Sequence, residues 1–346
     1  MLALDDHWVW DFWFADDGEH HHVFFLKAPR SLGDPDLRHV NAHVGHAVSN
    51  DLREWDILPD ALAPGPPGAW DDRATWTGNV VFHDDHWYLF YSGIDHAHEG
   101  LVQAIGMAHS SDLMTWRRAS EQPLVTPDPR WYERLDLDVW IDETCRDPWV
   151  FPDPSGHGFR MYYTARVNHG EPDGRGVIGQ AWSPDLWTWE SRPPVTDPGD
   201  FGHLEVPQLT EIAGRHYLVF SVYEWAHSAA RQRRAEPVCG THYMIGDSAL
   251  GPFRMLSDDF LLGSPEGPFY AGRVVRDRAG AWQFMTWAQF APDGSFIGVL
   301  ADPVPLVQHG DGRLSLAERP RVGHRGGHGG PRWRGGAVGG WTSSGW

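Results

Sequence analysis

One eleven-residue motif occurs three times in this chain of 346 residues. The segment GHAVSNDLREW at 45–55 returns as GMAHSSDLMTW at 106–116 and as GQAWSPDLWTW at 179–189. Successive copies begin 61 and 73 residues apart. A supersecondary unit repeated at such a spacing is typical of solenoids and propellers. The repeat therefore constrains the fold more than any single residue does.

Short runs rich in aromatic and β-branched residues accompany the motif. Five such runs begin at His22, Trp87, Phe159, Tyr217 and Trp282. Each run follows a polar turn, and another strand-like segment precedes each turn. Runs of this kind predict strands joined by tight hairpins. Five units of four antiparallel strands predict an all-β fold, a five-bladed β-propeller.

The Asp and Trp of the motif have a structural interpretation. A short carboxylate caps turns by accepting hydrogen bonds from backbone amides, and Trp fills the space between packed sheets. The residues concerned are Asp51, Asp112, Asp185, Trp55, Trp116 and Trp189. We assign them to the scaffold and not to a functional site.

Composition sets the class of partner. A formal charge of −19 argues against a nucleic-acid backbone and against an anionic membrane surface. A small neutral substrate fits better, and the 20 tryptophans include candidate platforms for sugar rings. We expect one propeller domain over 1–310 and a disordered tail over 311–346, where Gly, Arg and His accumulate.

The N-terminus lacks the basic and then apolar pattern of a signal peptide. We therefore expect a cytoplasmic protein, unless a truncated N-terminus hides an export signal. Cys145 and Cys239 alone give neither a disulfide framework nor zinc spacing. We expect no metal and no cofactor, and the sequence does not determine the oligomeric state.

Polar residues on the first strand of each predicted blade are the candidates for function. These strands line the central channel of a propeller, so their polar side chains converge at one end of the axis. The residues are Asp11, Thr77, Asn79, Arg146, Asp147, Glu205, Tyr270 and Arg273. Acids among Trp and Val are costly to bury unless they are paired or functional. Two carboxylates are the minimal machinery of glycoside hydrolysis, so the sequence predicts a glycosidase site.

In these residues and the segments around them, the chain resembles glycoside hydrolase family 32, the β-fructofuranosidases, and more distantly family 68, the levansucrases. The resemblance runs from Trp8 to about Pro303. GHAVSNDLREWDILPDALAPG matches a long segment of family 32, and CRDPWVF, LEVPQL and FYAGRVV match its Arg-Asp-Pro, Glu-Cys-Pro and Phe-Tyr-Ala motifs. WTGNVVF stands where the family has its Ser-Gly-Ser strand.

The resemblance implies roles for the three acids in a retaining hydrolase or transferase acting on terminal β-D-fructofuranosyl groups of sucrose, fructo-oligosaccharide or fructan. Asp11 would be the nucleophile, Asp147 the transition-state stabiliser and Glu205 the general acid/base. Arg146 would help to position Asp147 and the sugar. Burial beside two other acids would keep Glu205 protonated near neutral pH.

Substrate contacts are expected from further inner-strand residues. Trp10, Trp13 and Trp76 are candidate walls of the sugar slot, although core packing explains each of them equally well. Thr77, Asn79 and Tyr270 complete the expected substrate-binding set.

Three departures from family 32 are visible. VWDFWF around Asp11 is closer to the Val-Trp-Asp-x-Trp of family 68, and Val206 replaces the Cys after the acid. The chain also ends without the C-terminal β-sandwich of most family 32 members. Two alternatives stay open: an inverting furanosidase or xylosidase of family 43, in which Asp11 is a base and Glu266 competes with Glu205 as the acid, and a non-catalytic glycan-binding propeller.

Overall fold

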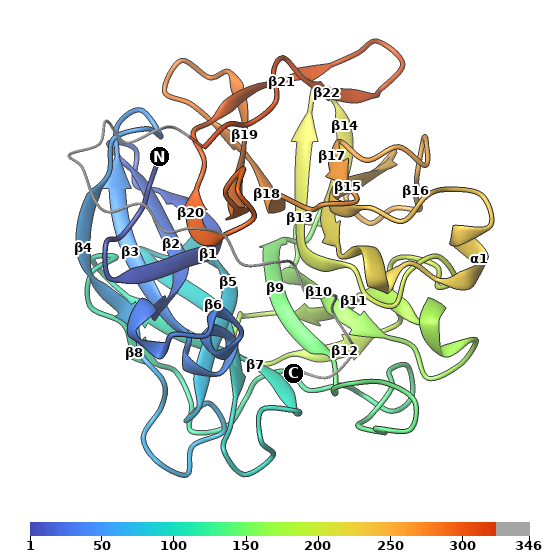
Figure 1. Cartoon of the computed structure of the whole chain (residues 1–346). Coiled ribbons are helices and arrows are strands. Elements are labelled where there is room, and N and C mark those ends of the chain that lie inside the picture. The colour runs from blue at the N-terminus through green and yellow to red at the C-terminus, as the bar shows by residue number, and fades with distance from the viewer. Residues whose placement is uncertain (323–346) are drawn as a thin grey trace.

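Five antiparallel sheets surround a central axis in the computed structural model, which describes residues 1–322 (Figure 1). The first three blades each have four strands in chain order. They are β1 (His7–Asp16), β2 (His21–Pro29), β3 (His43–Ser49) and β4 (Asp56–Leu62); β5 (Ala74–His83), β6 (His86–Ile94), β7 (Gln103–Ser110) and β8 (Arg117–Arg118); and β9 (Cys145–Pro152), β10 (Phe159–Arg166), β11 (Gly176–Ser183) and β12 (Glu190–Arg192).

The last two blades each carry a fifth strand. Blade four has β13 (Glu205–Ile212), β14 (Arg215–Val222), β15 (Cys239–Gly246) and β16 (Phe253–Arg254), with β17 (Leu262–Ser264) also paired to β15. Blade five has β18 (Phe269–Arg276), β19 (Trp282–Phe290), β20 (Phe296–Leu300), β21 (Val304–Gln308) and β22 (Leu314–Leu316). Both β20 and β21 pair with β19, so the third strand of this blade is interrupted. The predicted five-bladed propeller is confirmed.

Helical segments are short connections between strands. They are the 3-10 turns η1 (Arg30–Leu32), η2 (Pro35–Asn41), η3 (Pro172–Gly174) and η4 (Glu224–Ala226), and the single turn α1 (Ala229–Gln232). Within residues 1–322, none of them is long and apolar enough to cross a membrane. β22 lies beyond residue 310, and most of the predicted tail falls outside the described residues.

The repeated motif forms the same turn in three blades. In each turn the Asp side chain accepts hydrogen bonds from two backbone amides, as Asp112 Oδ1 does from Met114 at 2.9 Å and Thr115 at 2.8 Å. Asp51 and Asp185 do the same. The Leu that follows is buried with a positive φ of 63°, 61° or 69° at Leu52, Leu113 and Leu186. The scaffold interpretation of the motif is therefore confirmed.

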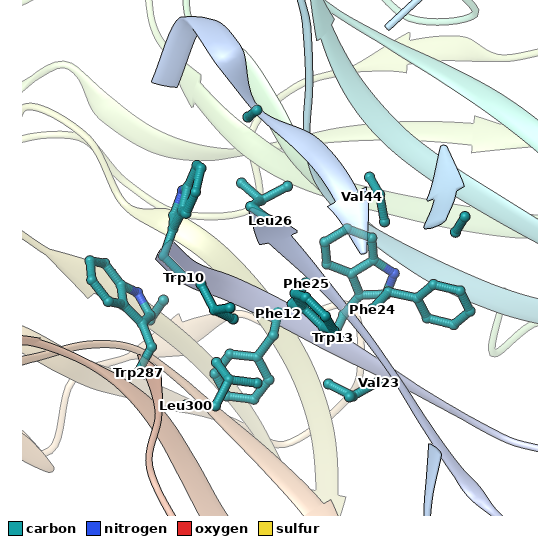
Figure 2. Close-up of a cluster of buried hydrophobic side chains, with 14 of the residues drawn as sticks. Trp10, Phe12, Trp13, Val23, Phe24, Phe25, Leu26, Val44, Trp287 and Leu300 are labelled. Atoms are coloured by element: carbon teal, nitrogen blue, oxygen red, sulfur yellow. The ribbon is translucent and has the colours of Figure 1, made fainter. Parts of the chain in front are cut away.

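Tryptophans of the motif pack between neighbouring blades. Trp116 meets Phe24 of blade one edge-on at 5.7 Å between ring centroids, and Trp189 meets Phe90 of blade two at 5.6 Å. Around Phe24, a large aromatic cluster fills the space between β1, β2 and their neighbours (Figure 2). The contacts of Trp116 and Trp189 join their motif turns to the second strand of the preceding blade.

The ring of blades is closed by its two ends. Leu2 and Leu300 exchange two backbone hydrogen bonds, of 3.1 and 2.9 Å, and thereby join the N-terminal segment to β20. Arg30 adds a bond from Nη2 to the carbonyl of Ile297 at 2.6 Å. Closure matters for the site because it fixes β1 beside β18 and β19.

Candidate active site

Each of the five inner strands carries a β-bulge at the level of the predicted polar residues. The pairing register shifts in β1 between Trp10 and Phe12, in β5 between Trp76 and Gly78, and at the corresponding points of β9, β13 and β18. A bulge inserts an extra residue and redirects side chains. Three residues at these bulges have positive φ values: Asp147 at 59°, Val206 at 47° and Ala271 at 50°. The bulges thus set the directions of the site side chains.

Asp11 lies at the bulge of β1 and keeps part of its surface accessible. Its Oδ1 accepts a hydrogen bond from Trp287 Nε1 at 2.9 Å, and its Oδ2 accepts one from Thr77 Oγ1 at 3.3 Å. Burial, together with the negative charges of Asp147 and Glu205, raises the pKa of Asp11 to about 7. Asp11 is therefore a carboxyl that changes charge near neutral pH.

Asp147 is held from two neighbouring strands. Its Oδ2 accepts hydrogen bonds from Thr164 Oγ1 at 3.0 Å and from the Val206 amide at 3.1 Å. Its own amide donates to Ser92 Oγ at 2.7 Å. Burial raises the pKa of Asp147, partly against the nearby Arg146 guanidinium. Val206 directly follows Glu205 in the chain. The hydrogen bond from the Val206 amide to Asp147 therefore links the position of Asp147 to that of Glu205.

Glu205 has the most contacts of the three acids. Arg146 donates to its Oε1 from Nη2 at 2.7 Å and from Nε at 3.2 Å, and the Tyr270 hydroxyl donates to its Oε2 at 2.5 Å. His203 Nε2 lies 3.6 Å from the same Oε2. The side chain is 13% exposed.

These contacts contradict the expectation that Glu205 is protonated near neutral pH. Burial acts to raise the pKa of Glu205, but His203, Arg146 and Tyr270 outweigh it and hold the pKa below its usual value. In the unliganded site the high pKa belongs to Asp11 instead. The sequence around Glu205 indicates burial and nearby acids, but not the hydrogen bonds that Arg146 and Tyr270 donate to it in the folded chain.

Arg146 joins the acids to a wider network. Besides Glu205, its Nη1 donates to Gln103 Oε1 at 3.0 Å and to Asp142 Oδ2 at 3.3 Å. Its Nε is 3.7 Å from Asp147 Oδ2, so its stronger contact is with Glu205 and not with Asp147. The guanidinium therefore positions mainly the predicted acid/base.

Arg273 supplies a second buried cation beneath the site. Its Nε donates to the Phe12 carbonyl at 3.0 Å, and its Nη1 donates to the carbonyls of Val206 and Pro207 at 2.9 Å each. Burial lowers the pKa of Arg273 to about 10, which leaves it charged at neutral pH. This charge acts to lower the pKa of Asp11 and is itself stabilised by Asp11 and Asp147.

The other predicted contact residues divide into two groups. Thr77 and Tyr270 touch the acids directly, as described above. Trp76 is partly exposed and donates from Nε1 to the His39 carbonyl at 2.7 Å, so a role beside the sugar stays a prediction.

The other three predicted contact residues are buried, and contact with a sugar stays a prediction for each of them. Asn79 is buried and its Oδ1 accepts from the Val150 amide at 2.9 Å, a bond that joins β5 to β9. Trp13 is 1% exposed and stacks on Phe24 in the core, as Figure 2 shows. Trp10 is also enclosed, packed against Arg38 and His39.

Several site residues were missed because they lie on second strands or connecting loops. A buried Ser or Thr recurs on the second strand of four blades, opposite the bulge: Ser92, Thr164, Ser221 and Thr286. Ser92 and Thr164 bind Asp147, and Thr286 donates to the Tyr270 carbonyl at 2.6 Å. A hydroxyl at the same place in YSG, YTA, FSV and MTW was a signal that could have revealed them.

Free thiols and metal ligands do not contribute to this arrangement. Cys145 and Cys239 are both buried and unbonded to each other. In the part of the chain described, residues 1–322, no three His, Cys, Asp or Glu side chains group as metal ligands would. What the site offers is carboxylates, arginines and hydroxyl donors, which suit acid/base and nucleophilic chemistry on a polar small molecule.

Comparison with known proteins gives a family match over most of the chain. The profile of the family described as "Glycosyl hydrolases family 32 N-terminal domain" matches residues 13–294. A sucrose-6-phosphate hydrolase of Bacillus subtilis is 24% identical over 275 residues, which are 77% of this chain and 51% of the relative. A β-fructofuranosidase of Arabidopsis thaliana, an insoluble isoenzyme, is 27% identical over 174 residues, 49% of this chain and 28% of the relative. The chain thus spans about half or less of these relatives.

A solved structure shares the fold. The inulosucrase of Halalkalicoccus jeotgali bound to kestose superposes with a TM-score of 0.75, at 23% identity, covering 90% of this chain and 87% of that one. At this level of identity the similarity establishes the propeller fold.

Proposed function

We propose that this chain, which belongs to glycosyl hydrolase family 32, cleaves or transfers terminal β-D-fructofuranosyl groups through a covalent fructosyl-enzyme. The observation that carries the proposal is the meeting of three carboxyls from β1, β9 and β13, which shift one another's pKa values. Relatives that are named β-fructofuranosidase, sucrose-6-phosphate hydrolase and fructosyltransferase support the fructosyl group as the common element.

In the first step, Asp11 attacks the anomeric carbon of the fructosyl group. Glu205 donates its proton to the oxygen of the departing sugar, the glycosidic bond breaks, and an ester forms between Asp11 and fructose. Trp287 and Thr77, which bind the two oxygens of Asp11, fix the direction of attack.

In the second step, Glu205 acts as a base. It takes a proton from water, or from the hydroxyl of a second sugar, and the resulting nucleophile displaces Asp11 from the anomeric carbon. Water gives free fructose, and a sugar acceptor gives a transfer product. Asp147, held by Thr164 and Val206, is placed to bind hydroxyls of the fructosyl ring as positive charge develops on it.

The proton of the acid pair has to change place during the reaction. Asp11 binds a proton more readily than Glu205, because its pKa is raised to about 7 and that of Glu205 lies below the usual value. The reactive form has the same total charge but carries the proton on Glu205. Substrate binding thus selects one of two arrangements of a single proton shared by two coupled acids.

A panel of substrates tests this function. Sucrose, inulin, levan, an arabinofuranoside and a xyloside are incubated with the chain, and free fructose and transfer products are quantified separately. We expect fructose release, with Glu205→Gln losing it by at least about a hundredfold. Glu211→Gln, an exposed position on the same strand, is the matched control and should leave the rate unchanged.

Product stereochemistry separates the mechanism from the inverting alternative. NMR taken early in the reaction should show fructose released first as the β-anomer. An initial product of inverted configuration would make Asp11 a base for water, as in the family 43 alternative. No turnover of any fructoside, arabinoside or xyloside would leave a glycan-binding propeller as the better description.

A further inference from the structure

Arg273 binds two inner strands from its place on a third. It follows the bulge of β18 and is 1% exposed. Its Nε donates to the Phe12 carbonyl of β1 at 3.0 Å, and its Nη1 donates to the carbonyls of Val206 and Pro207 of β13 at 2.9 Å each. Blade five closes the ring beside blade one, so a single guanidinium bridges β1 and β13 (Figure 1).

The acceptors of this guanidinium lie next to the reacting carboxyls in the chain. Phe12 directly follows Asp11, and Val206 directly follows Glu205. The Val206 amide also donates to Asp147 Oδ2 at 3.1 Å. The guanidinium therefore joins the backbone beside the proposed nucleophile to the backbone beside the proposed acid/base.

The backbone at these two bulges departs from the regular strand ladder. β1 and β13 each pair with the second strand of their own blade, and both pairings are interrupted at the bulge. Val206 has a φ of 47°, a left-handed conformation that is rare for a β-branched residue. Buried carbonyl groups at such a place need donors from elsewhere in the fold. Arg273 supplies them to Phe12, Val206 and Pro207.

The strand that carries Asp147 also contacts this guanidinium. The central carbon of the Arg273 side chain lies 5.7 Å from the centre of the Trp149 ring, two residues after Asp147 on β9. A planar guanidinium presents several donors in a fixed arrangement, so it can hold several partners at once. All three strands that carry the acids therefore meet one side chain of β18.

The positive charge of the same guanidinium acts on the proposed nucleophile. It lowers the pKa of Asp11, whereas burial and the charges of Asp147 and Glu205 raise it. Arg38 and Tyr223 are further ionisable groups that interact with Asp11. Loss of the guanidinium charge should raise the pKa of Asp11 further, because a favourable partner of the ionised form is removed.

We propose that Arg273 is a positioning residue that sets the distance between the Asp11 and Glu205 carboxyls by joining the bulges beside them. The inference rests on the proposed function, because this distance matters only if both carboxyls act on one glycosidic bond. A retaining mechanism needs a separation of about 5–5.5 Å, and a displacement of about 1 Å can lower a rate about a hundredfold. Arg273 acts through the backbone and not through contact with the sugar.

Arg273→Met and Arg273→Lys test the inference. Met removes the hydrogen bonds and the charge, whereas Lys keeps the charge but not the planar spread that reaches two strands. The substrate is the fructoside that the wild-type chain cleaves fastest. We expect kcat to fall about a hundredfold in the Met variant and about tenfold in the Lys variant, with KM within about threefold of wild type.

Arg231→Lys is the matched control. Arg231 is as deeply buried as Arg273, its central carbon lies 4.6 Å from the centre of the Phe201 ring, and its Nη2 donates to the Asp258 carbonyl at 2.9 Å. It therefore resembles Arg273 in burial and bonding but does not touch a bulge of an inner strand. Arg231→Lys should change kcat less than twofold at a temperature where the variant is folded.

The pH profile of kcat/KM separates positioning from a purely structural role. Its basic limb, expected near pH 7 in the wild type, should move to higher pH in Arg273→Met because the pKa of Asp11 rises. The limb should stay in place in Arg273→Lys, which keeps the charge. A residue that only stabilised the fold would lower the midpoint of urea unfolding without moving this limb.

Four results overturn the inference. They are a folded Arg273→Met variant with kcat within about threefold of wild type, a loss confined to KM, a basic limb that does not move, and the failure of both variants to fold. The last result would make Arg273 a residue of the scaffold. If only Arg273→Lys folds, a tenfold loss of kcat supports the inference and an unchanged kcat overturns it.

Failure of the proposed function gives a different result. A wild-type chain that cleaves no fructoside, arabinoside or xyloside overturns the function, and crystal structures of the wild type and of Arg273→Lys then decide the positioning role. A change of more than about 0.5 Å in the separation of the Asp11 and Glu205 carboxyls supports it. An unchanged separation overturns it.

Discussion

Arg146 holds Glu205 with two nitrogens of one guanidinium, Nη2 at 2.7 Å and Nε at 3.2 Å from the same carboxylate oxygen. The contact joins β9 to β13 and comes from the residue directly before Asp147. One side chain therefore orients the proposed acid/base, lowers its pKa and fixes its position relative to the proposed stabiliser.

Arg146→Lys removes this two-nitrogen contact but keeps a positive charge. An ammonium cannot serve Glu205, Gln103 and Asp142 together, because these bonds use the planar spread of the guanidinium. We expect kcat/KM for the fructoside substrate to fall by about a hundredfold. The control is Arg192→Lys, which alters a partly exposed ion pair with Glu190 and should change kcat/KM less than twofold. A similar small effect at Arg146 would show that the contact does not serve catalysis.

Activity should decline as the pH rises through about 7. Below this value the pair of Asp11 and Glu205 holds one proton, since Asp11 has its pKa near 7 and Glu205 has its pKa below the usual 4.5. Above it both are ionised, and no proton remains for the leaving oxygen. The kcat/KM profile should therefore be bell-shaped with its optimum on the acid side of 7. A rate that still rises from pH 7 to pH 9 would contradict this assignment.

Tyr270→Phe should move the acidic limb of the same profile. Tyr270 donates to the ionised form of Glu205, so its loss raises the pKa of Glu205 and shifts this limb to higher pH. Tyr217→Phe, which removes a buried hydroxyl bound to the Gly312 carbonyl, is the control and should leave the profile in place. The measurement is kcat/KM across the pH range for the three proteins.

Asp11→Asn should stabilise the fold at high pH. The folded-state pKa of Asp11 is raised, so its contribution to stability is complete below the unfolded value of 3.8 and is lost as the pH rises through about 7. At pH 8 the variant avoids a buried charge and should gain on the order of 2 kcal/mol in urea unfolding, with no gain at pH 3. Asp153→Asn, which breaks a bond to Arg160, should lose stability at pH 8. Equal stability of Asp11→Asn and wild type at pH 8 would refute the raised pKa.

The repeat allowed the fold and the three acids to be predicted from the sequence. The electrostatics of the site could not be predicted in this way. The motif copies identify the blades directly, and the Asp, Asp and Glu follow from the first-strand positions. The bulges are different, because they depend on pairing between strands and bring Thr77 but not Asn79 toward Asp11. The low pKa of Glu205 depends on His203, two residues earlier in the chain, and on Arg146 and Tyr270, which only the folded chain brings beside it from β9 and β18.

The hydrogen bond from the Val150 amide to Asn79, which joins β5 to β9, can be tested by removing its acceptor. Removing its amide in Asn79→Ala leaves the buried Val150 N–H without its acceptor, at a cost of about 1–3 kcal/mol in unfolding free energy. We expect KM and kcat to stay within about twofold of wild type at a temperature where the variant is folded. A raised KM without loss of stability would return Asn79 to the substrate-binding set.

The most direct test is to trap the fructosyl-enzyme. Glu205→Gln is mixed with a fructosyl substrate whose leaving group needs no protonation, so that the first step proceeds and the second is slow. After acid quench and proteolysis, mass spectrometry should find one fructosyl residue on the peptide that contains Asp11. A label on the Asp147 peptide, or continued turnover with no labelled peptide at all, would contradict the assignment of Asp11 as the nucleophile.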